Sequence, residues 1–285
     1  MSSQTPTSGY KSFAIAGVGL IGRPILDALL ARNVPVVVLT RSPKEDILPA
    51  GGKFATVDYN DVPGIAKVLK ENHVDVLIST VAQEALGQEQ ISLADASHEA
   101  GVKLFVPSEF GIPTVGRTQG IFGYKKNLTE HLQKLGIPSF RIFTGWFIEG
   151  ALDLAGYENN KKVNIIGKGT APISFTAMSD IAGFVAHVLT TQPREKVENK
   201  IARLEGDRAS LVELAGYLKT DIEYVDEITG PHGPNTTFLQ TFLDTGAGST
   251  GWDPVTNSEG PEKAGSGNAL WEGHQWKRIV DVVQV

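Results

Sequence analysis

Five apolar runs alternate with helix-like segments over the first half of the chain, and this alternation is the feature that most constrains the fold. The runs are rich in Val, Ile, Leu and Phe and lack the polar alternation of a half-exposed sheet, which is typical of strands covered on both faces. Strands that alternate with helices predict a parallel sheet with helices on both sides. The predicted strands cover residues 13–17, 34–39, 74–78, 102–106 and 139–143.

Helix signals lie between these runs. Asp61 stands as a cap before an apolar stripe at helical spacing, and the helical pattern of residues 91–100 ends at Gly101. Together with the strands they predict an α/β chain with a Rossmann-type, doubly wound parallel sheet.

The pattern loosens after Gly150. Two helices are predicted there, one capped by Asp180 and covering residues 181–189, the other covering residues 208–218. Residues 229–268 are rich in Gly, Pro, Thr and Asn, which indicates long ordered loops over a pocket.

The change in pattern predicts a division of the chain into two parts. We expect residues 1–155 to form one domain around the Rossmann-type sheet, with residues 179–205 packing back on it. Residues 156–285 are expected to form a smaller, loop-rich C-terminal substrate-binding domain.

Composition excludes several classes of chemistry. The 285 residues include no cysteine, which excludes a disulfide framework, a thiolate metal site and a cysteine nucleophile. The six histidines do not stand at metal-ligand spacing, so no metal site is expected. A net charge of −6 gives no positive field for nucleic acid or an anionic membrane surface. Residues 1–12 lack a secretory core and no run approaches the roughly 18 apolar residues of a membrane span, so we expect a soluble, cytoplasmic protein.

A glycine motif follows the first predicted strand directly. Gly17-Val-Gly19-Leu-Ile-Gly22 ends that strand and opens a helix, which is the place of a dinucleotide-binding loop. Gly17 permits the tight turn, Gly19 lets the backbone approach a pyrophosphate, and Gly22 allows the helix to pack closely on the strand. The free amides of this helix terminus bind phosphate oxygens, and we include Leu20 and Ile21 in the predicted site.

The end of the second predicted strand indicates which dinucleotide binds. An acidic residue there would hold the ribose 2′-hydroxyl of NAD, whereas a cationic side chain would hold the 2′-phosphate of NADP. Thr40-Arg41-Ser42 occupies this position, Lys44 follows, and no acid occurs before Glu45. We therefore predict NADP(H) as the cofactor, with Thr40, Arg41 and Lys44 in its site. The alternative is that Arg41 is an ordinary exposed residue.

One lysine lies on the apolar face of a predicted helix. In the helix of residues 122–135, Lys125 precedes Leu128 by three residues and shares its stripe with Leu132, whereas Lys126 points elsewhere. A partly desolvated ammonium near the positive end of the helix dipole can donate or accept a proton near neutral pH. The alternative is a lysine whose stem packs on the core while its head reaches solvent.

A tyrosine and a lysine form a weaker candidate pair. Tyr157 and Lys161 have the spacing of the catalytic pair of the standard short-chain dehydrogenases, in which the tyrosine transfers a proton. That pair needs one long helix, yet residues 163–167 predict a strand directly after it. We therefore assign this pair no catalytic role.

Several motifs carry a resemblance to a known family. After the glycine loop they are, in chain order, Val57-Asp-Tyr-Asn-Asp61, Val74-Asp-Val-Leu-Ile-Ser-Thr-Val81, Phe105-Val-Pro-Ser-Glu-Phe-Gly111 and Leu135-Gly-Ile-Pro138. In order and spacing they resemble the isoflavone reductase-like, NmrA-like branch of the atypical short-chain dehydrogenases. Two departures from this family are the Gly-Val-Gly-Leu-Ile-Gly form of the first loop and Gly145, where many members have an asparagine.

The resemblance implies an NADPH-dependent reductase. Its general acid or base is the lysine that opens the helix before Leu-Gly-Ile-Pro, and that position is Lys125 in this chain. The resemblance also places Thr80 and Val81 beside the cofactor and Asp58 near its adenine end, and we count Lys125 among the cofactor-binding residues as well. It implies a pocket for nicotinamide and substrate that is bordered by Pro107, Glu109, Phe110, Thr144, Trp146 and Phe147.

These observations predict an oxidoreductase that transfers hydride from NADPH to a small aromatic or conjugated molecule, isoflavonoid- or phenylpropanoid-like, with Lys125 as general acid or base. One alternative is an NADPH-dependent quinone reductase, whose electrophilic substrate needs less acid assistance. A second is a non-catalytic NADP(H) redox sensor of the NmrA type, although a sensor has no need of a desolvated acid. A homodimer is compatible with the sequence, which does not fix the oligomeric state.

Overall fold

The computed structural model describes residues 9–42, 52–230, 232–260 and 263–284. The chain divides into two compact units. The first contains residues 1–109, 117–141 and 182–201, and the second contains residues 110–116, 142–181 and 202–285. The first unit thus takes in residues 117–141 and the later segment 182–201.

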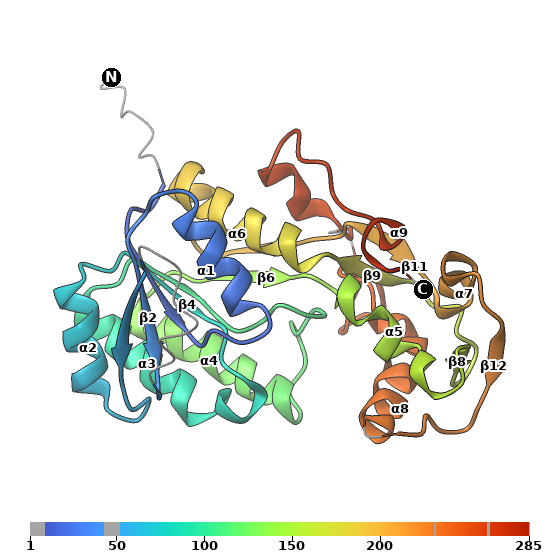
Figure 1. Ribbon diagram of the computed structural model, residues 1–285. Helices are drawn as coiled ribbons and strands as arrows, with labels where there is room; N and C mark the ends of the chain where they lie inside the picture. The colour runs from blue at the N-terminus through green and yellow to red at the C-terminus, as the bar shows by residue number, and fades with distance from the viewer. Residues whose placement is uncertain (1–8, 43–51, 231, 261–262, 285) are drawn as a thin grey trace. The chain divides into compact units, whose positions relative to one another are not determined.

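A parallel sheet forms the centre of the first unit (Figure 1). Its strand order is β3-β2-β1-β4-β5, and Phe13 of β1 lies beside Val36 of β2 and Val76 of β4. The order runs outward in both directions from β1, which confirms the doubly wound Rossmann-type fold. The strands are β1 Phe13–Ala16, β2 Val36–Thr40, β3 Lys53–Thr56, β4 Val76–Ser79 and β5 Leu104–Val106.

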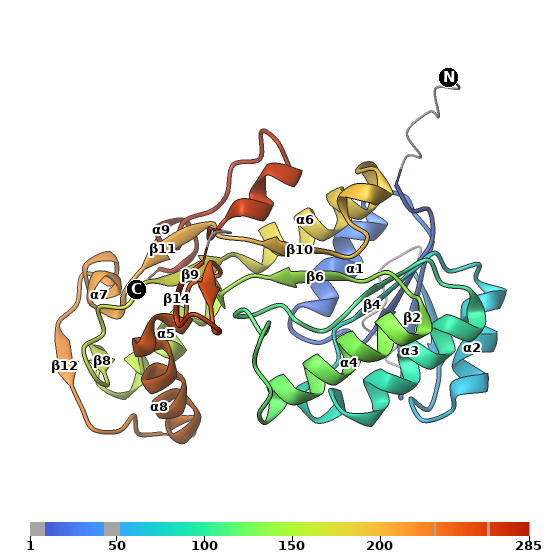
Figure 2. The same ribbon diagram turned by 180° about the vertical axis from the view of Figure 1, so that it is seen from behind.

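Helices cover both faces of this sheet. One core cluster joins the strands to α2, α3 and α4, which lie together in Figure 2, whereas α1 and α6 lie on the opposite face (Figure 1). The helices are α1 Gly22–Leu30, α2 Val62–Glu71, α3 Gln88–Ala100, α4 Ile121–Leu135 and α6 Met178–Thr191, with short 3-10 turns at η2 Gln83–Ala85 and η5 Arg194–Lys196.

Two predicted helix ends are confirmed. The Asp61 carboxylate accepts a hydrogen bond of 3.0 Å from the backbone N–H of Gly64, so it caps α2. Gly101 follows α3 with a φ of 73°, the left-handed conformation that ends many helices. Both signals depend on residues close in sequence, which is why the sequence shows them.

A third predicted cap is wrong. Helix α6 begins at Met178, and both carboxylate oxygens of Glu149 accept from the Met178 N–H, at 3.0 and 3.1 Å. Asp180 lies in the first turn instead. Its carboxylate accepts from the Lys277 N–H at 2.7 Å and lies 3.1 Å from His274 Nε2, so it binds the C-terminal segment.

The second unit is built from small sheets and short helices. Strand β9 lies between β11, which is antiparallel to it, and β7, which is parallel. The strands are β7 Trp146–Phe147, β8 Val163–Ile165, β9 Ile173–Thr176, β11 Asp207–Ala209, β12 Ile222–Tyr224, β13 Trp252–Asp253 and β14 Ser258–Glu259. The helices and turns are η3 Ile148–Gly150, α5 Ala151–Leu154, η4 Tyr157–Asn159, α7 Leu211–Leu218, α8 Gly233–Phe242, η6 Leu243–Ala247, η7 Ser266–Leu270 and α9 Ile279–Val282.

Two further strands, β6 Phe140–Phe143 and β10 Lys200–Arg203, pair with each other. Ser139, directly before β6, forms an isolated parallel bridge with Phe105 of β5, so this segment continues the parallel order of the first sheet. No helix in the described part of the chain has the length and apolar character needed to cross a membrane.

Two sequence-based assignments in the second unit are wrong. The helix expected from residue 208 begins at Leu211, because Ser210 and Glu213 form a capping box and residues 207–209 belong to β11. Residues 229–268, expected as loops, include the helix α8. Pro234 lies near the start of α8, and proline is well suited to the first turn of a helix. In the sequence this signal is outweighed by the glycine-rich composition around it.

The capping box yields a stability prediction. The Ser210 hydroxyl accepts a bond of 3.2 Å from the Glu213 N–H, and the Glu213 carboxylate accepts one of 2.8 Å from the Ser210 N–H. Replacing Ser210 by alanine should lower the free energy of unfolding by about 1 kcal/mol, which is typical of a lost cap. Urea denaturation measures this loss, and Ser210→Thr, which keeps the hydroxyl, is the matched control.

The effect of this replacement should depend on pH. The backbone N–H of Ser210 and then its hydroxyl hold the pKa of Glu213 below its usual range. A carboxyl with a lowered folded-state pKa stabilises the fold above its unfolded pKa and loses this contribution as the pH falls through the folded value. Ser210→Ala keeps the backbone N–H and loses only the hydroxyl bond to the Glu213 carboxylate, so the difference between wild type and this variant should shrink in part as the pH falls. A difference that is constant with pH would contradict this account.

Candidate functional site

Two of the three glycines in the loop, Gly17 and Gly22, have neighbouring atoms close to where a Cβ would lie. Gly17 has a φ of +91°, and the Thr80 hydroxyl donates a hydrogen bond of 2.6 Å to the Gly17 carbonyl oxygen. A Cβ at Gly22 would collide with the Gly17 carbonyl and with Thr80 Oγ1. Gly22 therefore lets α1 approach the ends of β1 and β4, as the sequence predicts.

The middle glycine of the loop, Gly19, has no such neighbour. A Cβ added at Gly19 would meet nothing within 4 Å, and the neighbouring Leu20 side chain is 69% exposed. The residue before α1 is Ile21, and no side chain in the described part of the chain caps the helix. An accessible backbone followed by uncapped helix amides fits a pyrophosphate group.

Arg41 lies at the end of β2 and is largely exposed. Its side chain is 64% exposed, its Nη1 lies 3.5 Å from Glu89 Oε1, and its guanidinium lies 5.8 Å from the centre of the Tyr59 ring. Thr40 binds its own turn, because its hydroxyl donates to the Ser42 carbonyl at 2.8 Å. The expected neighbour Lys44 lies outside the described residues.

Tyr59 and Asp58 follow β3 beside this arginine. The Tyr59 hydroxyl donates to the Leu39 carbonyl at 2.9 Å, and burial raises the pKa of Tyr59 to about 12. The hydrogen bond to Leu39 holds the Tyr59 ring near Arg41. Asp58 is exposed, and its carboxylate accepts from the Asn60 N–H at 2.9 Å within its own turn.

Two loops at the carboxyl ends of β4 and β5 are joined by hydrogen bonds. The Ser108 hydroxyl donates to the Val81 carbonyl at 3.1 Å, and the Ser108 N–H donates to Gln90 Oε1 at 2.9 Å. Val81 and Pro107 are buried beside these bonds. Ligands of doubly wound sheets bind at this edge.

Lys125 reaches the same edge from α4. Its side chain is only 12% exposed, and its Nζ donates to the Glu109 carbonyl at 3.1 Å and lies 3.3 Å from Glu109 Oε2. The next residues, Lys126 and Asn127, are exposed. The prediction that Lys125 lies on the buried face of its helix is thus confirmed.

Glu109 holds a second cation that the sequence analysis missed. Arg141 of β6 places Nε at 2.8 Å and Nη2 at 2.7 Å from Glu109 Oε1, and the carboxylate side chain is 1% exposed. A signal for this pair exists, because Arg141 interrupts the apolar run of residues 139–143. A charged side chain inside a covered strand requires a buried partner of opposite charge.

The other predicted pocket residues, Phe110, Thr144, Trp146 and Phe147, belong to the second unit. Thr144 is fully buried, and its carbonyl accepts from the Thr176 hydroxyl at 2.8 Å. Trp146 and Phe147 form β7 and are partly buried, and the Trp146 indole donates to the Gly150 carbonyl at 2.9 Å. Phe110 is buried and has a positive φ of 31°.

Gly145 has a structural reason to be glycine. Its φ is +66°, and a Cβ would collide with the Ser174 carbonyl oxygen. The asparagine found in many members of the resembled family would not fit this backbone.

The Tyr157 and Lys161 pair lacks a catalytic arrangement. Tyr157 lies in the short turn η4, and Lys161 Nζ donates to Glu158 at 2.5 Å. β8 begins at Val163, so the long helix that such a pair needs does not form, as expected.

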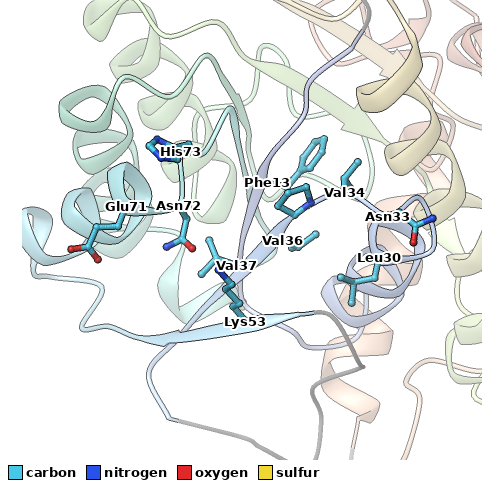
Figure 3. Close-up of a pocket in the computed structure, with 11 residues that line it drawn as sticks. Phe13, Leu30, Asn33, Val34, Val36, Val37, Lys53, Glu71, Asn72 and His73 are labelled. Atoms are coloured by element: carbon cyan, nitrogen blue, oxygen red, sulfur yellow. The ribbon is translucent and has the colours of Figure 1, made fainter.

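A cavity of about 560 Å³ lies at the other edge of the sheet (Figure 3). Figure 3 shows Glu71, Asn72 and His73 on one side of it and Leu30 and Asn33 on the other. The amino ends of β1, β2 and β3 line it, so it is separate from the glycine loop and from Lys125.

Fold and loop together define a doubly wound α/β protein whose first strand is followed by a glycine loop of the dinucleotide-binding type. The model of the NmrA-like family matches residues 13–240, and the chain belongs to this family.

Sequence relatives come from plants and fungi. The chain is 30% identical over 204 residues to phenylcoumaran benzylic ether reductase 1 of Arabidopsis thaliana. The aligned region covers 64% of this chain and 65% of that protein. It is 27% identical over 222 residues to oxidoreductase BOA1 of Botryotinia fuckeliana, covering 70% of this chain and 73% of that protein. The match thus spans just under two thirds of the first of these relatives.

The fold is also that of solved reductases. The structure of the leucoanthocyanidin reductase–NADPH complex from Vitis vinifera superposes with a TM-score of 0.75 at 24% identity, covering 94% of this chain and 96% of that one.

The glycine loop yields a second prediction. Gly22→Ala should destabilise the fold by about 1–3 kcal/mol, because the new methyl group collides with backbone and Thr80. Gly19→Ala is the matched control and should leave stability within about 0.5 kcal/mol of wild type, since its Cβ meets nothing. Urea denaturation of the two variants measures both values, and equal losses would show that α1 is not packed as described.

Proposed function

We propose that this chain is an NADP(H)-dependent reductase of a small aromatic or conjugated molecule of the phenylpropanoid or isoflavonoid class. The observation that carries the proposal is Lys125, a nearly buried ammonium held beside Glu109 at the carboxyl edge of a dinucleotide-binding sheet. The names of related proteins support it, because they include phenylcoumaran benzylic ether reductases and a eugenol synthase.

The glycine loop and the end of β2 would hold the cofactor. The open backbone at Gly19, with Leu20, Ile21 and Gly22, suits the pyrophosphate. Arg41 would bind the 2′-phosphate in place of its present partner Glu89. The remaining residues proposed to border the cofactor are Gly17, Thr40, Lys44, Asp58, Thr80, Val81 and Lys125.

In this proposal the protein itself supplies the proton of the reaction. When bound, NADPH supplies hydride to a substrate carbon. Lys125 gives one proton to the substrate oxygen that gains the electron pair, either at a carbonyl or at the leaving oxygen of an ether whose C–O bond breaks. The resulting amine regains a proton from water before the next turnover.

Aromatic side chains of the second unit would contact the substrate. Trp146 and Phe147 offer partly buried rings, and the indole bond to Gly150 fixes the Trp146 ring. We assign Pro107, Phe110 and Thr144 to the border of this pocket.

Loss of the Lys125 ammonium should abolish most turnover. Lys125→Ala should lower kcat for NADPH oxidation about 10²–10⁴-fold, because it removes the general acid. The dissociation constant of NADPH should change far less than kcat, since the proposed phosphate contacts lie elsewhere even though Lys125 borders the cofactor. The assay follows NADPH absorbance with enones, aryl ethers and quinones, and Lys126→Ala, which removes an exposed cation bonded to Glu130, is the matched control.

Two outcomes would contradict this assignment. Wild-type turnover of quinones by Lys125→Ala would identify a quinone reductase that needs no acid. Tighter binding of NADP⁺ than of NADPH, without oxidation of NADPH by any compound in the panel, would identify a redox sensor.

Arg41 should decide the choice of cofactor. Arg41→Ala should weaken NADPH binding about 10- to 100-fold, as expected for a lost charge-assisted hydrogen bond of about 1.5–3 kcal/mol, and leave NADH binding unchanged. Fluorescence titration measures both constants. Lys67→Ala, which removes an exposed cation from α2, controls for net charge. Equal binding of NADH and NADPH by the wild type would remove Arg41 from this role.

A further inference from the structure

Arg41 and Glu89 form an ion pair at the carboxyl edge of the parallel sheet. Arg41 follows β2, and Glu89 belongs to the first turn of α3, which comes after β4 in the chain. Strand β1 lies between β2 and β4, and the glycine loop follows β1 directly. The pair therefore joins the two segments on either side of the strand whose end carries the glycine loop.

This ion pair is long, and it is exposed on the arginine side. Arg41 Nη1 lies 3.5 Å from Glu89 Oε1, and the exposed fraction is 64% for the Arg41 side chain and 23% for that of Glu89. Charge-assisted hydrogen bonds between a nitrogen and a carboxylate are usually about 2.7–2.9 Å long. An exposed pair at the larger separation contributes little to stability, so a stronger anionic ligand can displace the carboxylate.

A second group contacts the same guanidinium without competing for its N–H groups. The Arg41 guanidinium lies 5.8 Å from the centre of the Tyr59 ring, and the Tyr59 hydroxyl donates to the Leu39 carbonyl at 2.9 Å. The face of an aromatic ring attracts a cation through its quadrupole and leaves the N–H groups of that cation to other acceptors. Tyr59 therefore holds the guanidinium in place while its N–H groups change from one anion to another.

A phosphate at Arg41 would have to replace the Glu89 carboxylate. A phosphate monoester carries close to two negative charges and binds a guanidinium through two hydrogen bonds, which favours the exchange. The displaced carboxylate then remains close to the phosphate, because the first turn of α3 fixes the Glu89 backbone, and the two like charges repel. Competition and repulsion both weaken the binding of a phosphate at this arginine.

We propose that Glu89 is a specificity-determining residue of the nucleotide site, because its carboxylate competes with a 2′-phosphate for Arg41 and so weakens the binding of 2′-phosphorylated nucleotides alone. The preference for NADPH over NADH is then smaller than Arg41 by itself would give. The inference rests on the proposed placement of the 2′-phosphate at Arg41 and on no step of the reduction.

The test compares two nucleotides that differ only in this phosphate. Adenosine 2′,5′-bisphosphate and adenosine 5′-monophosphate share the base, the ribose and the 5′-phosphate, and isothermal titration calorimetry gives the dissociation constant of each for the full chain. Glu89→Gln should bind the bisphosphate about three- to tenfold more tightly than wild type does, because competition and repulsion are both removed. Binding of the monophosphate should stay within about twofold of wild type, since it places no phosphate at Arg41.

Further variants show whether the effect depends on Arg41. In the Arg41→Ala background, Glu89→Gln should tighten bisphosphate binding by less than about twofold, because the phosphate is no longer held beside the carboxylate. Glu71→Gln removes an exposed carboxylate at the opposite edge of the sheet and is the matched control, which should change neither constant by more than about twofold. Circular dichroism checks folding, and Glu89→Ala, for which the same gain is expected, decides the matter if Glu89→Gln does not fold.

A purely structural role for Glu89 would give a different result. An acidic residue in the first turn of a helix stabilises that helix, so Glu89→Gln would lower the urea midpoint and leave the ratio of the two dissociation constants unchanged. That unchanged ratio overturns the inference, as does an equal gain with and without Arg41. Failure of the wild type to oxidise NADPH with any acceptor of the panel would overturn the proposed function instead, and it would not alter this comparison of nucleotides.

Discussion

A single buried carboxylate organises the carboxyl edge of the first unit's sheet. Glu109 joins three separate elements, because it follows β5, contacts Lys125 of α4 and accepts two bonds from Arg141 of β6. Burying three charged groups stabilises a fold less well than apolar residues of similar size would. A cluster of this kind therefore favours a chemical role over a contribution to stability. It buries most of the Lys125 side chain, and under the proposed function the ammonium of that side chain donates the proton.

The glycines of the loop differ in the space around them. At Gly22 the backbone of α1 touches Gly17 and Thr80, which leaves no room for a side chain. At Gly19 nothing lies within 4 Å of an added Cβ. One glycine therefore builds the fold and the other leaves space for a ligand, and both lie at the edge of the sheet that Lys125 reaches.

Features set by residues close in sequence could be predicted from the sequence. The strands β1, β2, β4, β5 and β6, the caps of α2 and α3, and the buried side of Lys125 all follow from local patterns. Strand β3 was missed, because Lys53–Thr56 is short and only partly buried. Its place at the edge of the sheet depends on pairing with β2, which no local pattern shows.

Partners distant in sequence were the main omission. Asp180 looks like a helix cap, yet it binds Lys277, and the cap comes from Glu149. Likewise Glu109 and Arg141 are 32 positions apart, so their pairing becomes visible only when β5 and β6 lie in one fold. The motif around Glu109 could be recognised, but not the role of its carboxylate.

The transfer of hydrogen itself tests the central claim most directly. The protein would be incubated with NADPH deuterated at the transferring C4 position and with a panel of conjugated phenolic compounds, and the products would be examined by mass spectrometry. The account predicts a reduced product that carries one deuterium from the cofactor, formed by the wild type and not by Lys125→Ala. Tight binding of NADPH with no deuterium in any product, or an equal yield from both proteins, would contradict it.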